Sequence, residues 1–434
     1  MVSKQKIGPL AILVLALWPV MIWATMLPWL VRFGGFGATM VSLAQLSGLV
    51  GMTLFSLVLI LGARVAWLEN YFGGLNRVYI LHHWLGGTAL ILLLFHPLFS
   101  AMAVLPVSVV AAAAIIWPLA SLVLFLGWAA LLVMISLLVL TFYLRPEYQI
   151  WKMTHKFLAA AFLLGGWHAF LIPSDIAQNW WLRSYIFGLA TVALVLYVRH
   201  SIFNAHKKYR YLVERVEKLN DAVWRIVMVA GQEAMRYQSA QFGWFKFING
   251  EVRAESHPFS FSSASNDDHL EITVKDLGVF SQSLARLKPG TAVEVQGPYG
   301  RFNFGWSRHR KQVWVGGGIG MTPFMGMSRD LRAETNNGYD INLFFAVRNK
   351  RELFALEDLY AIEKEAMRKL KLTVWFSDER GYLTAQKIKE LTNGSLKGTS
   401  FFICGPGPMM ASLKMQLLQE GVAKRDIYTE EFEL

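Results

Sequence analysis

Six long apolar runs in the first half of the chain constrain its fold more strongly than any other feature. A helix needs about 20 mostly apolar residues to cross a bilayer core roughly 30 Å thick. Runs near that length occupy residues 7–31, 39–63, 79–105, 109–144, 156–173 and 180–199 of the 434-residue sequence. We therefore predict a multi-domain membrane protein with a six-helix transmembrane bundle over residues 1–204 and the lipid bilayer as a partner.

The charged residues divide the chain at about residue 204. Residues 1–204 contain 10 Lys and Arg and 3 Asp and Glu, whereas the rest of the chain contains 32 and 27. The second half therefore has the composition of a soluble protein. The formal net charge of +12 is spread over both halves instead of forming a basic tail, so no nucleic-acid partner is expected.

Positive charges at the ends of the apolar runs predict the orientation in the membrane. Cytoplasmic loops of membrane proteins are enriched in Lys and Arg. If both termini are cytoplasmic, Arg32 and Arg183 are the two positive residues that fall outside. The set inside is then Lys4, Lys6, Arg64, Arg77, Arg145, Lys152, Lys156, Arg199, Lys207, Lys208 and Arg210. We predict a multi-pass protein of the plasma or inner membrane with cytoplasmic N- and C-termini.

The single cysteine, Cys404, limits the redox chemistry that the chain can perform. Iron–sulfur clusters need about four Cys ligands, or two Cys and two His, and c-type haem attachment needs a C-x-x-C-H motif. An intrachain disulfide is excluded as well. Electron transfer would therefore depend on non-covalent haem, flavin or another bound cofactor.

Histidines are concentrated in the apolar half, where six of the ten lie. Ionisable side chains inside membrane spans are costly and usually functional. His82 and His96 are 14 residues apart on the third run, and His155 and His168 are 13 apart on the fifth. These spacings correspond to about 21 and 19.5 Å of helical rise. Two parallel helices would each offer one imidazole near the inner surface and one near the outer, and paired neutral imidazoles are good axial ligands for haem iron.

The spacing of 13 is the less regular of the two. On an ideal helix it leaves His155 and His168 about 140° apart. A distortion at Gly165-Gly166, or tilt of the helix, would be needed to bring the two side chains into line.

Other interpretations of the histidines remain open from the residues alone. His83 is an alternative to His82, which we favour because it aligns better with His96. Single membrane histidines can also form hydrogen bonds between helices or line a proton path. Zinc is a poor alternative, because the two positions on each helix lie about 20 Å apart.

Two different strand patterns follow the apolar half. Short alternating runs near residues 222–229, 242–248, 270–275 and 292–296 predict an antiparallel β-barrel. From about residue 311 the pattern becomes strand, glycine-rich loop and helix, with later strands near residues 341–347, 372–377 and 400–404, which predicts an α/β domain with a parallel sheet. We place the domains at residues 1–204, 205–308 and 309–434.

Motifs in the soluble half indicate two nucleotide sites. The runs 257–264, 277–281 and 297–302 lie at strand ends, where they could present an aromatic ring and a hydroxyl to a flavin and turn amides to its pyrophosphate. The run 316–323 follows a strand and opens a helix, so its glycines would let the backbone approach a phosphate. The run 404–410 repeats this arrangement after a later strand, and both loops would face one site at the carboxyl edge of the sheet.

These motifs together resemble a known family. The soluble half resembles the ferredoxin-NADP reductase superfamily in its ordered motifs HPFSFSSA, LGVFS, GPYGRF, GGGIGMTPF and CGPGPMM. Joined to six spans with paired histidines, it resembles the NADPH oxidase and ferric reductase family from about residue 7 to 434. The histidine spacings of 14 and 13 are also those of that family.

The resemblance implies FAD in the barrel, NADPH or NADH in the α/β domain, and two b-type haems in the membrane. His82 and His155 would hold the inner haem iron, and His96 and His168 the outer one. The flavin residues implied are His257, Pro258, Phe259, Ser260, Lys275, Gly278, Ser281 and Phe432. The dinucleotide residues implied are Gly316, Gly317, Gly318, Gly320, Thr322, Pro323, Arg348, Cys404, Gly405 and Pro406.

Three of these residues are predicted to be catalytic. The resemblance places Ser260 near the reactive nitrogen of the flavin, Phe432 against its ring system and Cys404 beside the nicotinamide. The expected function is a transmembrane NAD(P)H oxidase that passes electrons through FAD and two bis-His haems to extracytoplasmic oxygen, forming superoxide.

The sequence leaves two candidates for the final electron acceptor. The alternative is a ferric reductase, or a reductase of another extracytoplasmic acceptor, with the same electron path. Family oxidases carry a further His where this chain has Ser100, and Arg32 could either attract an anion or extend its charge to the membrane surface. A transporter or haem sensor without enzymatic activity would leave the co-occurring flavin and dinucleotide motifs unexplained.

Overall fold

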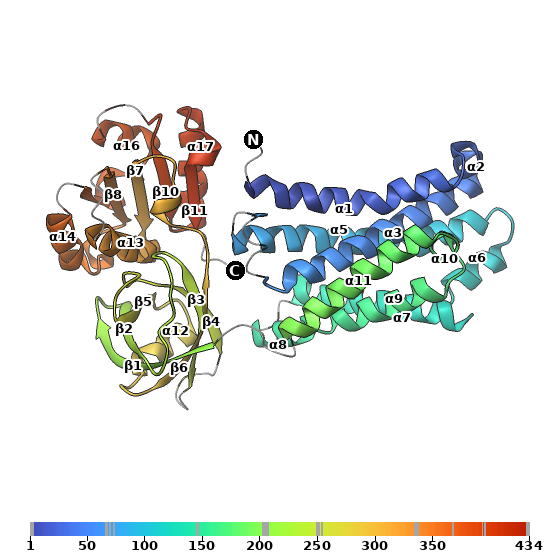
Figure 1. Ribbon diagram of the computed structural model, residues 1–434, viewed down its shortest axis with the longest axis horizontal. Coiled ribbons are helices and arrows are strands. Elements are labelled where there is room, and N and C mark those ends of the chain that lie inside the picture. The colour runs from blue at the N-terminus through green and yellow to red at the C-terminus, as the bar shows by residue number, and fades with distance from the viewer. Residues whose placement is uncertain are drawn as a thin grey trace. The chain divides into compact units, whose positions relative to one another are not determined.

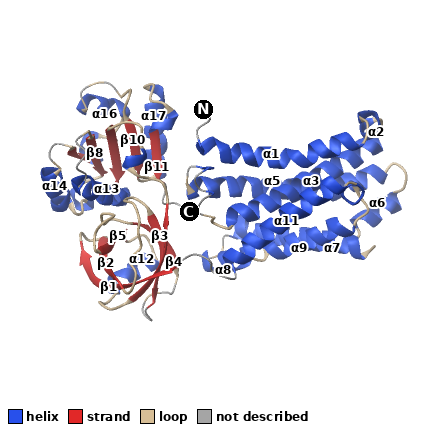
Figure 2. Cartoon of the chain, in the orientation of Figure 1, coloured by secondary structure: helices blue, strands red, loops and turns tan. Residues whose placement is uncertain are grey.

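The chain folds into two compact units, Met1–Ala205 and His206–Leu434, and each is described by itself. The computed structural model describes residues 4–65, 68, 71–72, 74–144, 146, 148–201, 208–248, 252, 255–333, 338–366, 369–392, 394 and 396–430. Figure 2 shows the first unit as helical and the second as a mixture of helices and strands.

Helices make up the regular structure of the first unit (Figure 1). They are α1 (Lys4–Met26), α2 (Trp29–Phe33), α3 (Phe36–Gly62), α5 (Leu75–Val104), α6 (Val109–Ile116), α7 (Leu122–Val139) with a π-helical turn η1 (Leu140–Leu144), α8 (Tyr148–His155), α9 (Leu158–Leu171), α10 (Asp175–Gln178) and α11 (Trp180–Ser201).

Five helical segments among the described residues are long and apolar enough to cross a membrane. They are Ile7–Met26, Phe36–Gly62, Arg77–Val104, Leu122–Leu144 and Trp180–Ser201. The predicted span over residues 156–173 instead contains α9, a helix of 14 residues. The structure thus gives a multi-pass arrangement, with one predicted span shorter than a bilayer-crossing helix.

One predicted run is interrupted in the structure, and another begins with a turn. The run 109–144 is divided into α6 and α7, because Trp117 precedes Pro118 and takes an extended backbone with ψ of 114°. A residue before proline is disfavoured in the helical region. Ser121 then starts α7 by accepting a hydrogen bond from the backbone N–H of Leu124. The run 156–173 begins with a turn at Lys156 and Phe157, which separates α8 from α9.

Helix α3 is the central helix of the first unit. Within its apolar window 61% of the residues are buried, against 28% or less in the other four candidate spans. It packs against α1, α5 and α11. Large apolar side chains on the other helices remain exposed, such as Leu132 at 64% and Val195 at 58%. Such an apolar exterior suits contact with lipid.

The first sheet of the second unit is antiparallel, in agreement with the prediction. Its six strands follow the order β4-β3-β6-β1-β2-β5. Its outer strands are linked by a bridge between Phe261 and Ile272. The strands are β1 (Lys208–Lys218), β2 (Val223–Ala230), β3 (Phe242–Ile248), β4 (Ser256–Ser260), β5 (His269–Lys275) and β6 (Ala292–Tyr299), with helix α12 (Val279–Ser283) before β6.

The second sheet is parallel, also in agreement with the prediction, and its five strands follow the order β11-β10-β7-β8-β9. Trp314 of β7 contributes to the core under α13 and α14, whereas Val313 and Val315 contribute to the core under α16 and α17. The elements are β7 (Lys311–Gly317), α13 (Thr322–Ala333), β8 (Asp340–Val347), α14 (Leu356–Glu365), β9 (Leu370–Phe376), α15 (Ser377–Arg380), α16 (Ala385–Leu391), β10 (Ser400–Cys404), α17 (Gly407–Gln419) and β11 (Ile427–Glu430). Helices therefore cover both faces of this sheet.

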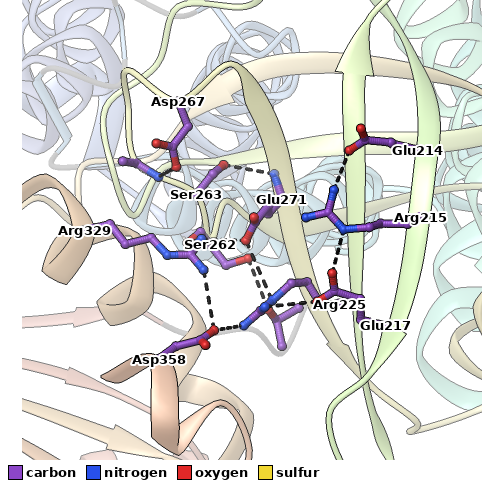
Figure 3. Close-up of polar contacts among 12 residues, drawn as sticks. Glu214, Arg215, Glu217, Arg225, Ser262, Ser263, Asp267, Glu271, Arg329 and Asp358 are labelled. Atoms are coloured by element: carbon purple, nitrogen blue, oxygen red, sulfur yellow. Dashed lines mark hydrogen bonds and ion pairs between the residues drawn. The ribbon is translucent and has the colours of Figure 1, made fainter. Parts of the chain in front are cut away.

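An ion-pair network joins the two sheets of the second unit (Figure 3). Arg225 of β2 pairs with Asp358 of α14 and with Glu217 of β1. Arg329 of α13 pairs with Glu271 of β5 at 2.5 Å. Burial alone would lower the pKa of Arg225, but the carboxylates of Asp358, Glu271 and Glu217 outweigh it and raise that pKa. These charges connect the antiparallel sheet to the helices of the parallel one.

Candidate functional site

The four predicted membrane ligands lie in two facing pairs. The ring centroids of His82 and His155 are 6.2 Å apart, and those of His96 and His168 are also 6.2 Å apart. An imidazole nitrogen bonds a first-row metal at about 2 Å, so two axial imidazoles place their ring centroids roughly 6 Å apart. The separation in each pair therefore fits one metal ion held between two rings.

The break between α8 and α9 accounts for the irregular spacing of His155 and His168. His155 is the last residue of α8, whereas His168 lies in the last turn of α9. The turn at Lys156 and Phe157 separates the two helices. The side chains can therefore both face α5 without a distortion at Gly165-Gly166.

His83 is placed differently from His82. Its ring lies 5.4 Å from the ring of Phe142, in an edge-to-face arrangement, whereas the ring of His82 faces His155. Of these two neighbouring histidines of α5, His82 is therefore the one that faces His155.

Backbone carbonyl groups orient three of the four rings. The Nδ1 atom of His82 lies 3.0 Å from the carbonyl oxygen of Val58, and that of His96 lies 2.7 Å from the oxygen of Ala44. The Nδ1 atom of His168 lies 2.7 Å from the oxygen of Val123. A ring that donates from Nδ1 leaves the lone pair of Nε2 available to a metal. The Nδ1 atom of His155 is buried without a hydrogen-bond partner among the described residues.

A cavity of about 320 Å³ lies beside His96 and His168. Its walls are mainly apolar, and Gln45, Ser100 and Asp175 give it polar groups. No cluster of three or more His, Cys, Asp or Glu side chains is placed to hold a metal within the described part of the chain. The site thus offers two imidazoles in an apolar cavity, which is a donor set and a setting that suit a haem rather than a bare metal ion.

Arg32 is buried near this cavity and is held by several partners. Its Nη1 atom lies 3.2 Å from Oδ2 of Asp175 and 3.0 Å from Oε1 of Gln45. Its Nη2 atom donates to the carbonyl oxygen of Trp23, and the guanidinium carbon lies 3.6 Å from the centroid of the Trp23 ring. Arg32 therefore neither faces solvent nor carries an uncompensated charge. Sequence reasoning missed Asp175, although it is one of three acidic residues in residues 1–204.

The predicted flavin motif begins on β4, which contains His257, Pro258, Phe259 and Ser260. The Nε2 atom of His257 lies 3.1 Å from Oε2 of Glu255, and its ring stacks on Phe280 at a centroid distance of 3.7 Å. The hydroxyl of Ser260 is buried and has no hydrogen-bond partner among the described residues. A buried hydroxyl without a partner fits a bound group that would complete its hydrogen bonds.

Backbone amides of the loop after β5 form hydrogen bonds within the loop itself. Lys275 ends β5 and pairs with Val223, and the loop then reaches Gly278 before α12. The Ser281 hydroxyl oxygen accepts hydrogen bonds from the backbone N–H groups of Leu277 at 2.9 Å and Gly278 at 3.0 Å. In this conformation, these two amides are therefore engaged within the loop instead of being available to a pyrophosphate.

The two glycine-containing loops of the parallel sheet lie together. Strand β7 ends at Gly317 and its neighbour β10 ends at Cys404. From β7 the chain proceeds to β8 and β9 on one side, whereas β10 and β11 lie on the other. Ligands of open parallel sheets bind outside the carboxyl ends of the strands where the order reverses in this way.

Glycines make this close approach possible. A Cβ atom on Gly320 would lie 2.4 Å from the carbonyl oxygen of Cys404, and one on Gly405 would lie 3.0 Å from the Cα of Gly317. A Cβ on Gly316 would lie 2.6 Å from Sδ of Met321. Gly320 and Gly405 are therefore required for packing between the two loops, and Gly316 for packing of the end of β7 against the loop that follows it, whatever they bind.

The remaining predicted dinucleotide residues surround the same edge. Gly318 has a φ of +54°, and Thr322 starts α13 with its hydroxyl donating to the carbonyl of Ile319. The others are Pro323 in the first turn of α13, Pro406 before α17, and exposed Arg348 directly after β8. Phe432 lies outside the described residues.

Cys404 is fully buried in the apolar core under α13. Burial, with a smaller contribution from the charge of Glu430, raises the pKa of its thiol well above the ordinary value. The thiol therefore stays protonated at neutral pH, and its place in the core excludes the role of a thiolate nucleophile.

A multi-pass helical unit joined to an antiparallel and a parallel sheet, with glycine loops at the switch point, defines a membrane-bound oxidoreductase of the flavin and pyridine-nucleotide class. Three protein-family models match the chain. They describe a ferric reductase like transmembrane component at residues 47–166, an FAD-binding domain at 208–303 and an oxidoreductase NAD-binding domain at 314–415. The chain thus combines a ferric-reductase-like transmembrane part with FAD- and NAD-binding parts of the ferredoxin-NADP reductase type, a combination that matches the ferric reductase/NADPH oxidase-like family.

Curated relatives and solved structures resemble part of the chain. Flavohemoprotein A of Dictyostelium discoideum is 28% identical over 195 residues, which are 42% of this chain and 48% of that protein. The flavohemoprotein of Oceanobacillus iheyensis is 26% identical over 220 residues, or 44% and 50%. The chain thus spans about half the length of these relatives. A solved structure of the flavohem-like FAD/NAD-binding domain of a nitric oxide dioxygenase from Vibrio cholerae is 23% identical to this chain, with a TM-score of 0.46. The match covers 51% of this chain and 98% of that structure's chain.

Proposed function

We propose that this protein is a transmembrane NAD(P)H oxidase. It takes electrons from cytoplasmic NADPH or NADH and passes them through FAD and two bis-His b haems to extracytoplasmic oxygen, forming superoxide. In this proposal α9, extended by α8, is the fifth of six spans, the antiparallel sheet is a barrel that holds FAD, and both termini are cytoplasmic. The protein would reside in the plasma or inner membrane.

The equal ring separations in the two histidine pairs carry the proposal. Each pair has a centroid distance of 6.2 Å. Three of these histidines direct Nδ1 to a backbone carbonyl group of a neighbouring helix, so these hydrogen bonds do not use Nε2. That arrangement leaves Nε2 for a ligand between the rings. His82 with His155, and His96 with His168, would therefore each hold one haem.

The soluble residues would position the two substrates of hydride transfer. A nicotinamide gives up two electrons as hydride whereas haem iron accepts one at a time, so bound FAD supplies the conversion between them. Ser260 would donate its otherwise unpartnered hydroxyl to the flavin, and Phe432 would cover the ring. Gly316 to Pro323 and Gly405 would hold the dinucleotide, with Arg348 toward a 2′-phosphate. Cys404 would form an uncharged wall beside the nicotinamide.

The charges near the outer histidine pair favour oxygen as the acceptor. Arg32 is compensated by Asp175, so this region presents no net positive charge to an anionic ferric chelate. A small neutral molecule needs no such charge. The second candidate, reduction of ferric iron, is supported by the match of residues 47–166 to a ferric reductase like component. Both candidates use the same electron path.

Optical spectroscopy of the detergent-purified protein tests the proposal. We expect a reduced low-spin haem spectrum when NADPH or NADH is added under nitrogen, and reoxidation with superoxide formation when air is admitted. His96→Ala and His168→Ala should each lose part of the haem signal. Purified protein without a reducible haem spectrum would contradict the electron path. A steady rate of NADPH consumption that needs ferric citrate and is unaffected by removing oxygen would favour the second candidate.

A further inference from the structure

Three of the four membrane histidines rest against a neighbouring helix in the same local arrangement. In each case Nδ1 faces a backbone carbonyl group, and the residue four positions after that carbonyl is a glycine. The carbonyl–glycine pairs are Ala44 and Gly48 at His96, Val58 and Gly62 at His82, and Val123 and Gly127 at His168. The repetition on helices α3 and α7 calls for a common physical reason.

The geometry of a helix supplies that reason. Side chains tilt toward the N-terminus, so a residue covers the helix surface one turn before its own Cα. A side chain at the fourth position after a carbonyl would therefore cover the approach to that carbonyl. Glycine leaves the approach open, and an imidazole can donate to an oxygen that already accepts the helical hydrogen bond.

Distances at the glycines show that the histidine rings occupy this space. A Cβ on Gly127 would lie 2.9 Å from Nδ1 of His168, and one on Gly48 would lie 3.0 Å from Nδ1 of His96. The three heavy atoms nearest to each of these positions all belong to the histidine ring. At Gly62 the contact is looser, with 3.4 Å to Cε1 of His82.

We infer that Gly127, Gly48 and Gly62 are positioning residues that seat the haem-binding histidines against backbone carbonyl groups. This inference rests on the proposed haem function. Each glycine lets Nδ1–H donate to the carbonyl, which fixes the tautomer and directs Nε2 toward the iron. His155 has no corresponding carbonyl group, because its Nδ1 has no hydrogen-bond partner among the described residues. The requirement for glycine decreases from Gly127 through Gly48 to Gly62.

A histidine ring, and not the backbone of a packed helix, occupies the space beside these glycines. A Cβ on Gly127 or Gly48 would meet the ring first, at 2.9 and 3.0 Å. Gly87 on α5 and Gly188 on α11 provide the comparison, since within the described structure no atom beyond their own helix backbone and chain neighbours lies within 4 Å of a Cβ added there.

Alanine substitutions in the full-length protein test the inference. The spectra of Gly127→Ala, Gly48→Ala and Gly62→Ala are compared with those of the wild type, with Gly87→Ala and Gly188→Ala as controls. Loss of an outer hydrogen bond at a metal ligand typically weakens metal binding 10–100-fold. We expect Gly127→Ala to lose the haem of the His96–His168 pair, or to convert part of it to a high-spin spectrum. Gly48→Ala should show a smaller change of the same kind.

The redox titration gives a second readout. Without the Nδ1–H hydrogen bond the imidazole donates less charge to the iron, so the midpoint potential of the affected haem should move to more positive values. Gly62→Ala should shift the other haem slightly, and the controls should leave both unchanged. If Gly127→Ala does not give folded protein, judged by size-exclusion elution and FAD content, Gly48→Ala and Gly62→Ala provide the test.

The outcomes separate this inference from the proposed function. Wild-type protein without haem would overturn both. Wild-type protein with two haems, together with Gly127→Ala and Gly48→Ala whose spectra and potentials match the controls, would overturn the seating role and leave the proposed function intact.

Discussion

Arg32 and Asp175, which are 143 residues apart in the sequence, form a buried ion pair with an Nη1–Oδ2 distance of 3.2 Å. Their side chains are 3% and 12% exposed. The pair connects the segment after α1 to the segment before α11. It also converts the two charges into a nearly neutral unit, which is the form in which charges are tolerated inside a membrane protein.

Asp175→Asn is expected to lower the stability of the membrane unit. The substitution leaves the Arg32 charge buried without its partner, and removing one member of a buried pair costs about 3–5 kcal/mol. Thermal unfolding of the purified protein, followed by tryptophan fluorescence, measures the effect. The double variant Arg32→Gln/Asp175→Asn removes both charges and should be more stable than Asp175→Asn. Equal unfolding temperatures for the wild type and Asp175→Asn would show that the pair is not a stabilising element.

Arg329→Ala is expected to loosen the connection between the two sheets. Arg329 contributes a 2.5 Å ion pair to Glu271, whose side chain is 13% exposed, and also donates to the carbonyl of Ser262. Loss of this partner should destabilise the soluble unit by about 2–4 kcal/mol. Arg332→Ala, on the same helix, is the matched control. Its pair with Glu365 is exposed on both sides, at 48% and 53%, so its loss should have an effect below about 1 kcal/mol.

The experiment follows denaturation of the full-length protein by the fluorescence of its flavin. A loss of stability that is the same for Arg329→Ala and Arg332→Ala would contradict the special role of the network in Figure 3. Arg329→Lys should fall between the wild type and Arg329→Ala, because an ammonium group keeps the charge but not the forked geometry.

Ser260→Ala should raise the stability of the FAD-free protein but slow the reduction of bound FAD. The Ser260 hydroxyl is buried without a partner among the described residues, and such a group costs about 1–3 kcal/mol. Its removal should therefore raise the stability of the FAD-free protein by roughly 1 kcal/mol. If the hydroxyl serves bound flavin, reduction of FAD by NADPH in stopped-flow experiments should slow by about tenfold, the factor for 1.4 kcal/mol. Unchanged flavin reduction would contradict the predicted role of Ser260.

Cys404 should make stability fall at alkaline pH. Burial raises the pKa of the folded-state thiol, whereas the unfolded thiol titrates near about 8.5. Above that pH the unfolded chain loses a proton that the folded chain keeps. The unfolded state is then favoured, and stability falls by up to about 1.4 kcal/mol per pH unit until the folded pKa is reached. Below about pH 8 the thiol is protonated in both states and contributes no slope.

Unfolding curves of the wild type and Cys404→Ala between pH 7 and about 10 measure this difference. The wild type should lose more stability over that range than the variant, whatever their difference at pH 7. Because the thiol is fully buried, iodoacetamide should label the native protein only after denaturant is added. Parallel pH profiles for the two proteins would show that Cys404 does not titrate on unfolding.

Sequence reasoning identified the features that depend on neighbours along the chain. The apolar runs predicted a multi-pass protein, and the alternating strands and the strand–glycine–helix pattern predicted an antiparallel and a parallel sheet in the correct order. Five long apolar helices and the two sheets agree with this. These patterns can be recognised from the sequence because helix length and strand alternation are properties of consecutive residues.

The sequence could not predict how local elements end or what their ends contact. The span predicted over residues 156–173 contains a helix of 14 residues, α9, which begins after a turn at Lys156 and Phe157. The hydroxyl of Ser281 took the amides of Leu277 and Gly278 that had been expected to face a phosphate. Both outcomes depend on competition between nearby hydrogen-bond partners, which residue spacing does not resolve.

By itself the sequence determined the class of the molecule: membrane spans, paired histidines and ordered nucleotide motifs in one chain. Only the tertiary structure decided that Asp175 compensates Arg32, that His82 rather than His83 faces His155, and that Gly48 and Gly127 lie under histidine rings. The physical reason is that charge pairing, ring orientation and close packing are relations between residues far apart in the chain. They exist once helices such as α3, α5 and α9 are packed side by side, because only then are the distances between their side chains defined.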